Sequence, residues 1–237
     1  MPIAIPNDFE QFMAEIEYEY KKRFDDYSIL ENHIKMTWKK DNEELARMLM
    51  NTLIVMIYSF YEGFCKCLFD IYINYINKTE VNVGSLEIAL AASSLSDDFK
   101  RLEDTHYVPG HPHIDFRKNG KLLRFARRIE FTSKYSIMMD KAVNLPEGLT
   151  NTESNLNIEV LERIMYTLGL DYSFLEGKRG PINMIVNRRN DAAHGTFDRT
   201  MSDEEFNKYK QAVISTVEMI KQEVIDSYRE RKYMKTA

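Results

Sequence analysis

The sequence predicts an all-α protein, an up-and-down bundle of four to five long helices with an inserted, partly irregular segment. Apolar residues recur at three- and four-residue steps over several long stretches, the period of a helix with one buried face. Only 9 glycines and 6 prolines occur in 237 residues, too few for the many tight turns of an all-β protein. We expect one domain over residues 1–237, with an insertion at 79–150.

Two helices are expected before the insertion. An apolar stripe marks the first, through Phe9, Phe12, Met13, Ile16, Tyr20, Phe24 and Tyr27. The second covers residues 42–76 and is apolar around most of its circumference, as expected of a central bundle helix. Its longest apolar stretch, 53–60, is far shorter than a membrane span.

Both cysteines, Cys65 and Cys67, lie in that second helix and point in different directions, which argues against a disulfide between them. Two buried thiols are typical of a reducing compartment. The chain opens with no charged-then-apolar leader. We therefore expect a cytoplasmic protein with no membrane association.

The insertion is expected to hold a short helix at 85–94 and a second helix at 122–143. Between them, residues 105–119 are rich in turn-forming residues, with Pro109 and Gly110 among them. The run also holds His106, His111 and His113, a possible zinc site. No cysteine lies near, and histidine in such a run is more often plain turn composition. We expect no metal and no cofactor.

Three further helices are expected after the insertion. The first covers 155–168 and ends at Gly169, and the next has Pro181 in its first turn, continues to His194 and is capped by Gly195. Ser202 and Glu205 have the spacing of a capping box that opens the last helix. Its apolar stripe is Phe206, Tyr209, Val213, Val217, Ile220, Val224 and Tyr228.

A dense polar cluster closes the helix that ends at His194. Asn190 and His194 are four residues apart on one face, which places the Asn190 amide to hydrogen-bond the imidazole. An imidazole can take a proton from a ribose 2′-hydroxyl, and the Arg189 guanidinium can hold a phosphate by two hydrogen bonds. Neither role needs a metal. The alternative is that Arg189 and His194 only cap a helix, where a cation is favourable.

The pattern R-N-x-x-A-H-G, from Arg189 to Gly195, resembles the R-x4-6-H signature of HEPN domains. Residues 53–66, an apolar run followed by Tyr, Glu-Gly and Lys, are similar to a helix of the MAE-type HEPN branch. Residues 153–170, with Ser-Asn-Leu and Leu-Gly, are similar to another helix of that branch.

This resemblance implies a helical bundle that dimerises around two motif helices and cuts single-stranded RNA without metal, leaving a 2′,3′-cyclic phosphate. It implies that Arg189 binds phosphate, that His194 is the catalytic imidazole and that Asn190 is the polar residue following the arginine. Many such proteins belong to toxin–antitoxin or antiviral defence systems. One subgroup carries a tyrosine that an antitoxin modifies; Thr196 stands there in this chain, so that control is not expected.

Other charged residues are candidates for supporting roles. Glu62 and Lys66 form either an ion pair on an exposed strip or a pair that orients Arg189 or His194 in the cleft. The net charge of −5 excludes whole-protein basicity as a reason for RNA binding. Two local basic patches remain, and solvated surface charge is the alternative for each: Lys178, Arg179 and Arg188 in one, and Arg124, Arg127 and Arg128, on a shared helical face, in the other.

The leading hypothesis is a homodimeric, metal-independent endoribonuclease, a defence or toxin effector whose partners are RNA and an antitoxin or defence-system protein. One alternative is a non-catalytic HEPN module that binds RNA, a nucleotide or a protein partner. A third is a purely oligomeric role in which the motif caps a helix.

Overall fold

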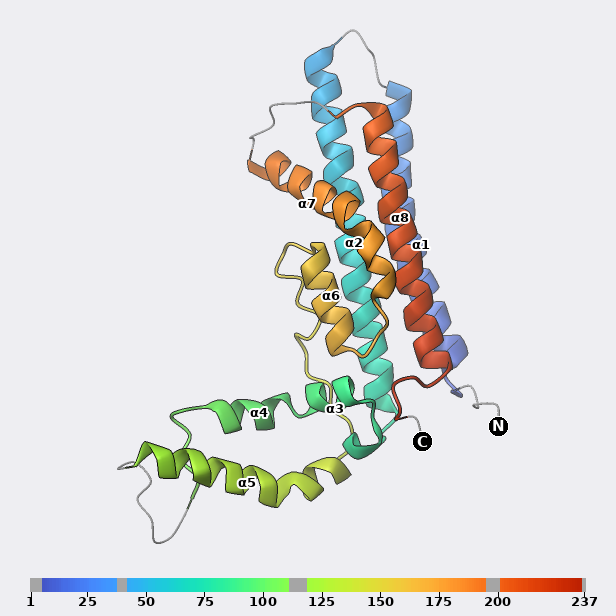
Figure 1. Cartoon of the computed structure of the whole chain (residues 1–237). Coiled ribbons are helices and arrows are strands. Elements are labelled where there is room, and N and C mark those ends of the chain that lie inside the picture. Colours follow the sequence, from blue (N-terminus) through green and yellow to red (C-terminus); the bar gives the residue numbers. More distant parts are fainter. Residues whose placement is uncertain (1–5, 38–41, 111–118, 195–200, 236–237) are drawn as a thin grey trace.

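The computed structural model describes residues 6–37, 42–110, 119–194 and 201–235, and within these it is all-α, as predicted (Figure 1). The only β-pairing in this part of the chain consists of isolated bridges. Two short 3-10 helices, Val83–Ser85 and Ser173–Lys178, join the α-helices. The α-helices are α1 (Phe9–Thr37), α2 (Glu43–Lys78), α3 (Ile88–Ser94), α4 (Ser96–Glu103), α5 (Gly120–Asp140), α6 (Ile158–Thr167), α7 (Arg179–His194) and α8 (Asp203–Arg229).

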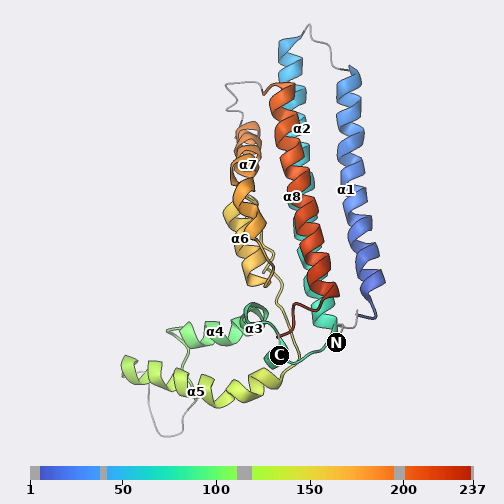
Figure 2. The ribbon, with the colours of Figure 1, turned by 45° about the vertical axis from the view of Figure 1, so that its right-hand side comes forward.

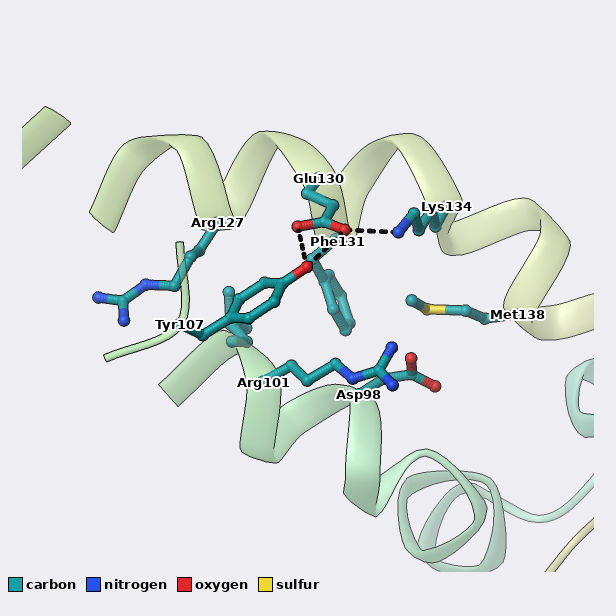
Figure 3. A pocket seen from close by; sticks show the side chains of 9 residues that line it. Asp98, Arg101, Tyr107, Arg127, Glu130, Phe131, Lys134 and Met138 are labelled. Atoms are coloured by element: carbon teal, nitrogen blue, oxygen red, sulfur yellow. Dashed lines mark hydrogen bonds and ion pairs between the residues drawn. The ribbon is translucent and has the colours of Figure 1, made fainter. Parts of the chain in front are cut away.

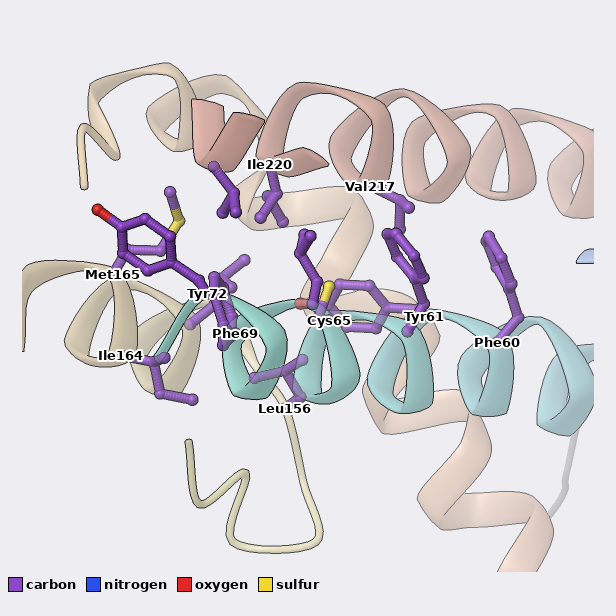
Figure 4. Close-up of a cluster of buried hydrophobic side chains, with 14 of the residues drawn as sticks. Phe60, Tyr61, Cys65, Phe69, Tyr72, Leu156, Ile164, Met165, Val217 and Ile220 are labelled. Atoms are coloured by element: carbon purple, nitrogen blue, oxygen red, sulfur yellow. The ribbon is translucent and has the colours of Figure 1, made fainter. Parts of the chain in front are cut away.

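Helix α2 is the centre of the bundle, as its all-round apolarity predicts. It packs against α1, α7 and α8, and Figures 1 and 2 both show α1, α2 and α8 side by side. Figure 4 shows its Tyr61 beside Val217 of α8 and its Tyr72 beside Met165 of α6. Each such ring contributes about 1.5–3 kcal/mol through removal of apolar surface from water. Burial on several sides therefore fixes α2 as the helix on which the others assemble.

The length and composition of α2 also meet the criteria for a membrane-spanning helix, with a mean hydropathy of 1.3 over an 18-residue window. Over half of that window is buried against the rest of the protein. The core helix of a bundle passes the same test, so this feature is weak evidence for a membrane. The expectation of no membrane association stays a prediction.

Both cysteines of α2 are free thiols. Cys65 is buried and Cys67 is half-buried, so the expectation of two buried thiols is wrong for Cys67. Residues two positions apart on a helix point about 200° apart around its axis, so only one of Cys65 and Cys67 can face the core fully. Burial raises the pKa of the Cys65 thiol, which keeps it protonated.

Aromatic contacts fix the lower end of the bundle. The ring of Phe12 in α1 lies 4.4 Å from that of Tyr228 in α8 and 5.1 Å from that of Tyr75 in α2, centroid to centroid. The Tyr228 hydroxyl donates to the Asp8 carboxylate at 2.8 Å. Edge and tilted ring pairs add about 0.5–1.5 kcal/mol each beyond area burial. Three helices separated in sequence are thereby held together at one end.

Helix ends follow the local signals read from the sequence. The capping box of Ser202 and Glu205 is formed at the start of α8. Gly169 follows α6 with a φ of 66°, and a Cβ there would lie 2.6 Å from Oε2 of Glu87. Only glycine tolerates both demands. Gly195, the expected cap of α7, lies outside the described residues.

Within the predicted insertion, helices α4 and α5 form an arm that projects from the base of the bundle (Figures 1 and 2). Its neck is a bridge between Asn82 and Ala142. Helix α3 packs on α6 and belongs to the main core, whereas α4 and α5 share a small core of their own. Helix α4 was not expected from the sequence; it is only eight residues long, and Phe99 and Leu102 are its only large apolar side chains.

Candidate functional site

Arg189 faces α2 because α7 lies across that helix, burying Ile182, Ile185 and Val186 on its inner side. Its guanidinium lies over the ring of Tyr58, 4.3 Å from Cζ to the ring centroid. One guanidinium nitrogen, Nη2, is 3.6 Å from Oε2 of Glu62, one helical turn after Tyr58. Stacking and an ion pair on α2 thus fix the plane of the arginine.

A short loop before α6 contacts the same nitrogen of the guanidinium. The Ser154 carbonyl accepts a hydrogen bond from Nη2 of Arg189 at 2.9 Å. Glu153 and Ser154 both have left-handed backbones, with φ of 55° and 56°. Such conformations cost about 1–3 kcal/mol each in non-glycine residues and cluster at functional sites. The next residues anchor the loop: the Leu156 amide donates to the Tyr58 hydroxyl at 2.8 Å.

Asn190 positions Arg189 instead of the imidazole. Its Oδ1 accepts from Nη1 of Arg189 at 2.9 Å, and its Nδ2 donates to Oδ1 of Asn155 at 3.4 Å. Both ends of the amide are therefore used within the chain. The expected hydrogen bond from Asn190 to His194 is absent from the part of the chain that the structure describes.

The Arg189 site is partly shielded from solvent. The side chain of Arg189 is 24% exposed and that of Glu62 19% exposed. Oε1 of Glu62 is buried with no hydrogen-bond partner among the described residues. Burial raises the pKa of Tyr58, and the nearby Glu62 carboxylate adds to the shift, so this phenol stays neutral. Both terminal nitrogens of the guanidinium have partners, Nη1 with Asn190 and Nη2 with Ser154, and the exposed part of the side chain is the part that a ligand can reach.

His194 is the last residue of α7 and is exposed. It lies five positions after Arg189 on the helix, which places the two side chains roughly 140° apart around the axis and about 7.5 Å apart along it. Within one chain they therefore face different directions. Gly195 and Thr196, which follow, lie outside the described residues.

A family model, RiboL-PSP-HEPN, matches residues 18–226, from α1 to the last turns of α8. The chain belongs to the RiboL-PSP-HEPN family. This confirms that it is a HEPN domain; the match does not confirm the MAE-type branch that the sequence suggested. The comparisons with curated proteins and with solved structures returned no match.

Of the two charged residues that α2 was expected to contribute to this HEPN site, the structure brings only Glu62 to Arg189. Lys66 is exposed one turn further along and contacts neither Arg189 nor Glu62 within 4 Å. The expected pair of Glu62 and Lys66 is therefore not formed. Sequence reasoning missed Tyr58 and Ser154 as holders of Arg189. Both lie in segments that carried the HEPN resemblance, and that was the available signal.

The basic patch near α7 is largely engaged within the chain. Arg179 pairs with Glu159 and, at 2.9 Å, with Glu162. Lys178 donates to the Ser215 hydroxyl at 2.9 Å. Arg188 is half-buried and also has a partner. These contacts weaken the prediction that the three residues bind RNA, because an ion-paired cation has less charge to offer a phosphate.

The second patch, on α5 of the HEPN arm, does not share one face. Arg124 and Arg128 are exposed, whereas Arg127 is 7% exposed and lines the pocket between α4 and α5, so the prediction of a shared exposed face is wrong for Arg127. Figure 3 shows the adjoining pocket, where Glu130 accepts from Tyr107 and Lys134 and the Arg127 guanidinium points away from them. The hydrogen bonds of Lys134 and Tyr107 lower the pKa of Glu130, so it stays ionised.

The structure does not test the possible zinc site at His106, His111 and His113. Within the described ranges, no group of three or more His, Cys, Asp or Glu side chains is arranged to hold a metal ion. His106 lies in that part of the chain, and His111 and His113 lie outside it. The zinc alternative therefore stays open.

Proposed function

We propose that this HEPN domain is a metal-independent endoribonuclease that cleaves single-stranded RNA at a site shared by two subunits. The observation that carries the proposal is the preorganised Arg189. Tyr58, Glu62, Ser154 and Asn190 hold its guanidinium in one orientation, and its side chain is 24% exposed. A fixed fork of donors stabilises developing phosphate charge without rearranging during the reaction. The family membership supports an RNA-related role.

The chemistry needs only an imidazole, a guanidinium and the substrate. His194 takes the proton of a ribose 2′-hydroxyl, and the 2′-oxygen bonds to the adjacent phosphorus. The bond from phosphorus to the 5′-oxygen breaks, and the protonated imidazole returns its proton to that oxygen. Arg189 neutralises the charge on the non-bridging oxygens. The products are a 2′,3′-cyclic phosphate and a 5′-hydroxyl end.

A second subunit is part of the proposal because one chain does not bring the two groups face to face. The Arg189 side chain packs against Tyr58 of α2, whereas His194 lies at the exposed end of α7. A two-fold dimer places the same helix end of each chain at one interface. The arginine of one subunit and the histidine of the other can then meet one phosphate.

The test compares RNA cleavage in EDTA by wild type, Arg189→Ala and His194→Ala. We expect each variant to lose at least about 10²-fold in rate, while wild type stays active in the chelator. Matched controls are His106→Ala in the arm and Arg229→Ala at the end of α8, which should cleave as wild type does. Full activity in either site variant, or wild-type cleavage abolished by EDTA, would sink the scheme.

The second candidate is a HEPN module that binds RNA, a nucleotide or a protein without cutting. It is favoured by the full set of intramolecular partners on Arg189 and Asn190, which would serve as well to fix a structural helix end. Tight RNA binding by wild type with no cyclic-phosphate product would select this candidate.

We further propose that the protein acts in the cytoplasm as an effector of a toxin–antitoxin or antiviral defence system, with an antitoxin or defence partner. The support is the HEPN resemblance together with a nuclease-type site that would need control in a living cell. Inducible expression tests it: growth arrest that requires both Arg189 and His194 is expected.

A further inference from the structure

A cleft begins one helical turn along α2 from Glu62, the residue that pairs with Arg189. It has a volume of about 490 Å³, within the range of sites that hold small organic ligands. Helix α2 forms one wall, and the loop that leads to α6 forms the other. Its lining residues are Lys66, Asp70, Ile73, Asn74, Glu147, Gly148, Thr150 and Asn151.

The two walls of this cleft are the two segments that hold Arg189. Along α2, Glu62, Lys66, Asp70 and Asn74 follow at four-residue steps, so the row extends about 18 Å at 1.5 Å per residue. Glu62 contacts Arg189 at its start. The loop touches Arg189 at Ser154 and lines the cleft three residues earlier. A strand of RNA whose phosphate lies at Arg189 therefore has the cleft next to it.

Polar contacts fix the loop that forms the second wall, to α2 on one side and to α6 on the other. The Thr150 hydroxyl donates to Oδ1 of Asp70 at 2.6 Å, joining loop and helix across the cleft. Arg163 of α6 donates to the Asn151 carbonyl at 3.1 Å and pairs with Glu153 at 3.0 Å. The cleft is therefore preorganised, because its loop is tied to α2 and α6 before any ligand arrives.

The charges of the cleft exclude a phosphate and favour a neutral group with N–H donors. Asp70 and Glu147 are acceptors when ionised, and only Lys66 among the lining residues is a cation. Lys66 lies at the Arg189 end of the row and forms no ion pair within the described residues. No aromatic ring lines the cleft, so binding by ring stacking is not offered.

We infer that this cleft binds the base of the nucleotide next to the phosphate held by Arg189, and that Asp70 selects bases with an exocyclic amino group over uracil. The position of that phosphate rests on the proposed function. Cytosine presents an amino donor where uracil presents a carbonyl acceptor. The Asp70 carboxylate attracts the amino group of cytosine and repels the carbonyl oxygen of uracil. Oδ1 of Asp70 already accepts from Thr150, and Oδ2 is the oxygen left for the base.

The test measures binding and needs no cleavage. His194→Ala protein is titrated with fluorescent octamers of cytidylate and of uridylate at one salt concentration. We expect oligocytidylate to bind at least about tenfold more tightly, the lower end of what one base contact discriminates. Asp70→Asn in the same protein should remove about that tenfold preference. Its amide donates to the uracil carbonyl, and its Oδ1 still accepts from Thr150.

Asp25→Asn, an exposed substitution of the same kind on α1, is the matched control and should keep the preference. Equal affinity for the two octamers, or a preference that Asp70→Asn leaves unchanged at an unaltered melting temperature, overturns the base site. A wild type that cuts no RNA but shows the Asp70-dependent preference defeats the nuclease proposal alone. A wild type that cuts RNA with no such preference defeats the base site alone.

Discussion

Buried charges in this bundle are matched by partners from other helices. Glu31 of α1 is buried, and its Oε1 accepts from Nζ of Lys210 in α8 and of Lys35 one turn on, each at 2.8 Å. Burial alone would raise the pKa of Glu31, but the hydrogen bonds of Lys210 and Lys35 outweigh it and lower the pKa. The carboxylate therefore links α1 to α8 only while it is ionised.

Glu31→Gln should destabilise the protein by about 1–3 kcal/mol at pH 7, because Lys210 loses its charged partner. A carboxyl whose pKa is lowered on folding stabilises above its unfolded pKa of about 4.5 and loses that contribution as pH falls through the folded value. Urea unfolding at pH 7 and at pH 3 should thus show a smaller difference between the two proteins in acid. Glu10→Gln is the exposed control. A difference that is the same at both pH values would contradict the ion-pair account.

The arginine was predicted from its own sequence neighbourhood, but its environment was not. The motif singled out Arg189, Asn190 and His194 because their spacing within one helix is local information. Tyr58 and Ser154 reach Arg189 only when α2 and the loop before α6 fold against α7. The predicted hydrogen bond from Asn190 to His194 was wrong for the same reason. In the folded chain Arg189 and Asn155 lie beside the Asn190 amide and form its hydrogen bonds.

At the scale of helices, the start and end signals were reliable where they depend on adjacent residues. Ser202 and Gly169 act within one turn of their own position, so a capping box and a left-handed glycine can be read directly. Helix α4 was not predicted because it packs against α5, which lies beyond a turn-rich stretch of the chain. The contacts that stabilise α4 are therefore tertiary and leave no local pattern in the sequence.

The arm of α4 and α5 should be dispensable for folding of the bundle. Ser94 and Asn144 touch where the arm leaves and returns, with the Asn144 amide donating to the Ser94 hydroxyl at 3.1 Å. Replacing residues 96–140 by a short Gly/Ser linker should lower the melting temperature by less than about 4 °C, the shift of roughly 1 kcal/mol in a protein of this size. Thermal unfolding followed by circular dichroism measures it.

A longer deletion that also removes α3 is the contrast. Leu90 of α3 is fully buried in the main core, and the Ser93 hydroxyl donates to the Thr167 carbonyl of α6. That deletion should abolish cooperative unfolding. If both deletions unfold alike, α4 and α5 are part of the bundle and the arm is no separate unit.

At the scale of the whole molecule, the proposed reaction depends on a second copy of the chain. Arg189 and His194 act across the interface in this scheme, since each chain turns them apart. Dimerisation is itself a prediction, checked by light scattering at micromolar concentration.

Mixed dimers separate action across the interface from action within a chain. A heterodimer of Arg189→Ala and His194→Ala subunits, isolated by two affinity tags, keeps one Arg189 and one His194 on different chains. We expect it to cleave RNA at least about tenfold faster than either mutant homodimer. A heterodimer as inactive as its parents would show that each chain needs both groups, which would defeat the shared site.

The sequence by itself determined the helical class, the course of the long helices and the motif residues on which the proposed reaction depends. Periodicity, caps and motif spacing are all written within a few residues of one another. Only the tertiary structure decided that Tyr58, Glu62 and Ser154 enclose Arg189, that Lys66 lines a neighbouring cleft and that Arg127 is buried. These depend on how α7, the loop before α6 and the arm pack, and packing joins residues that no local pattern connects.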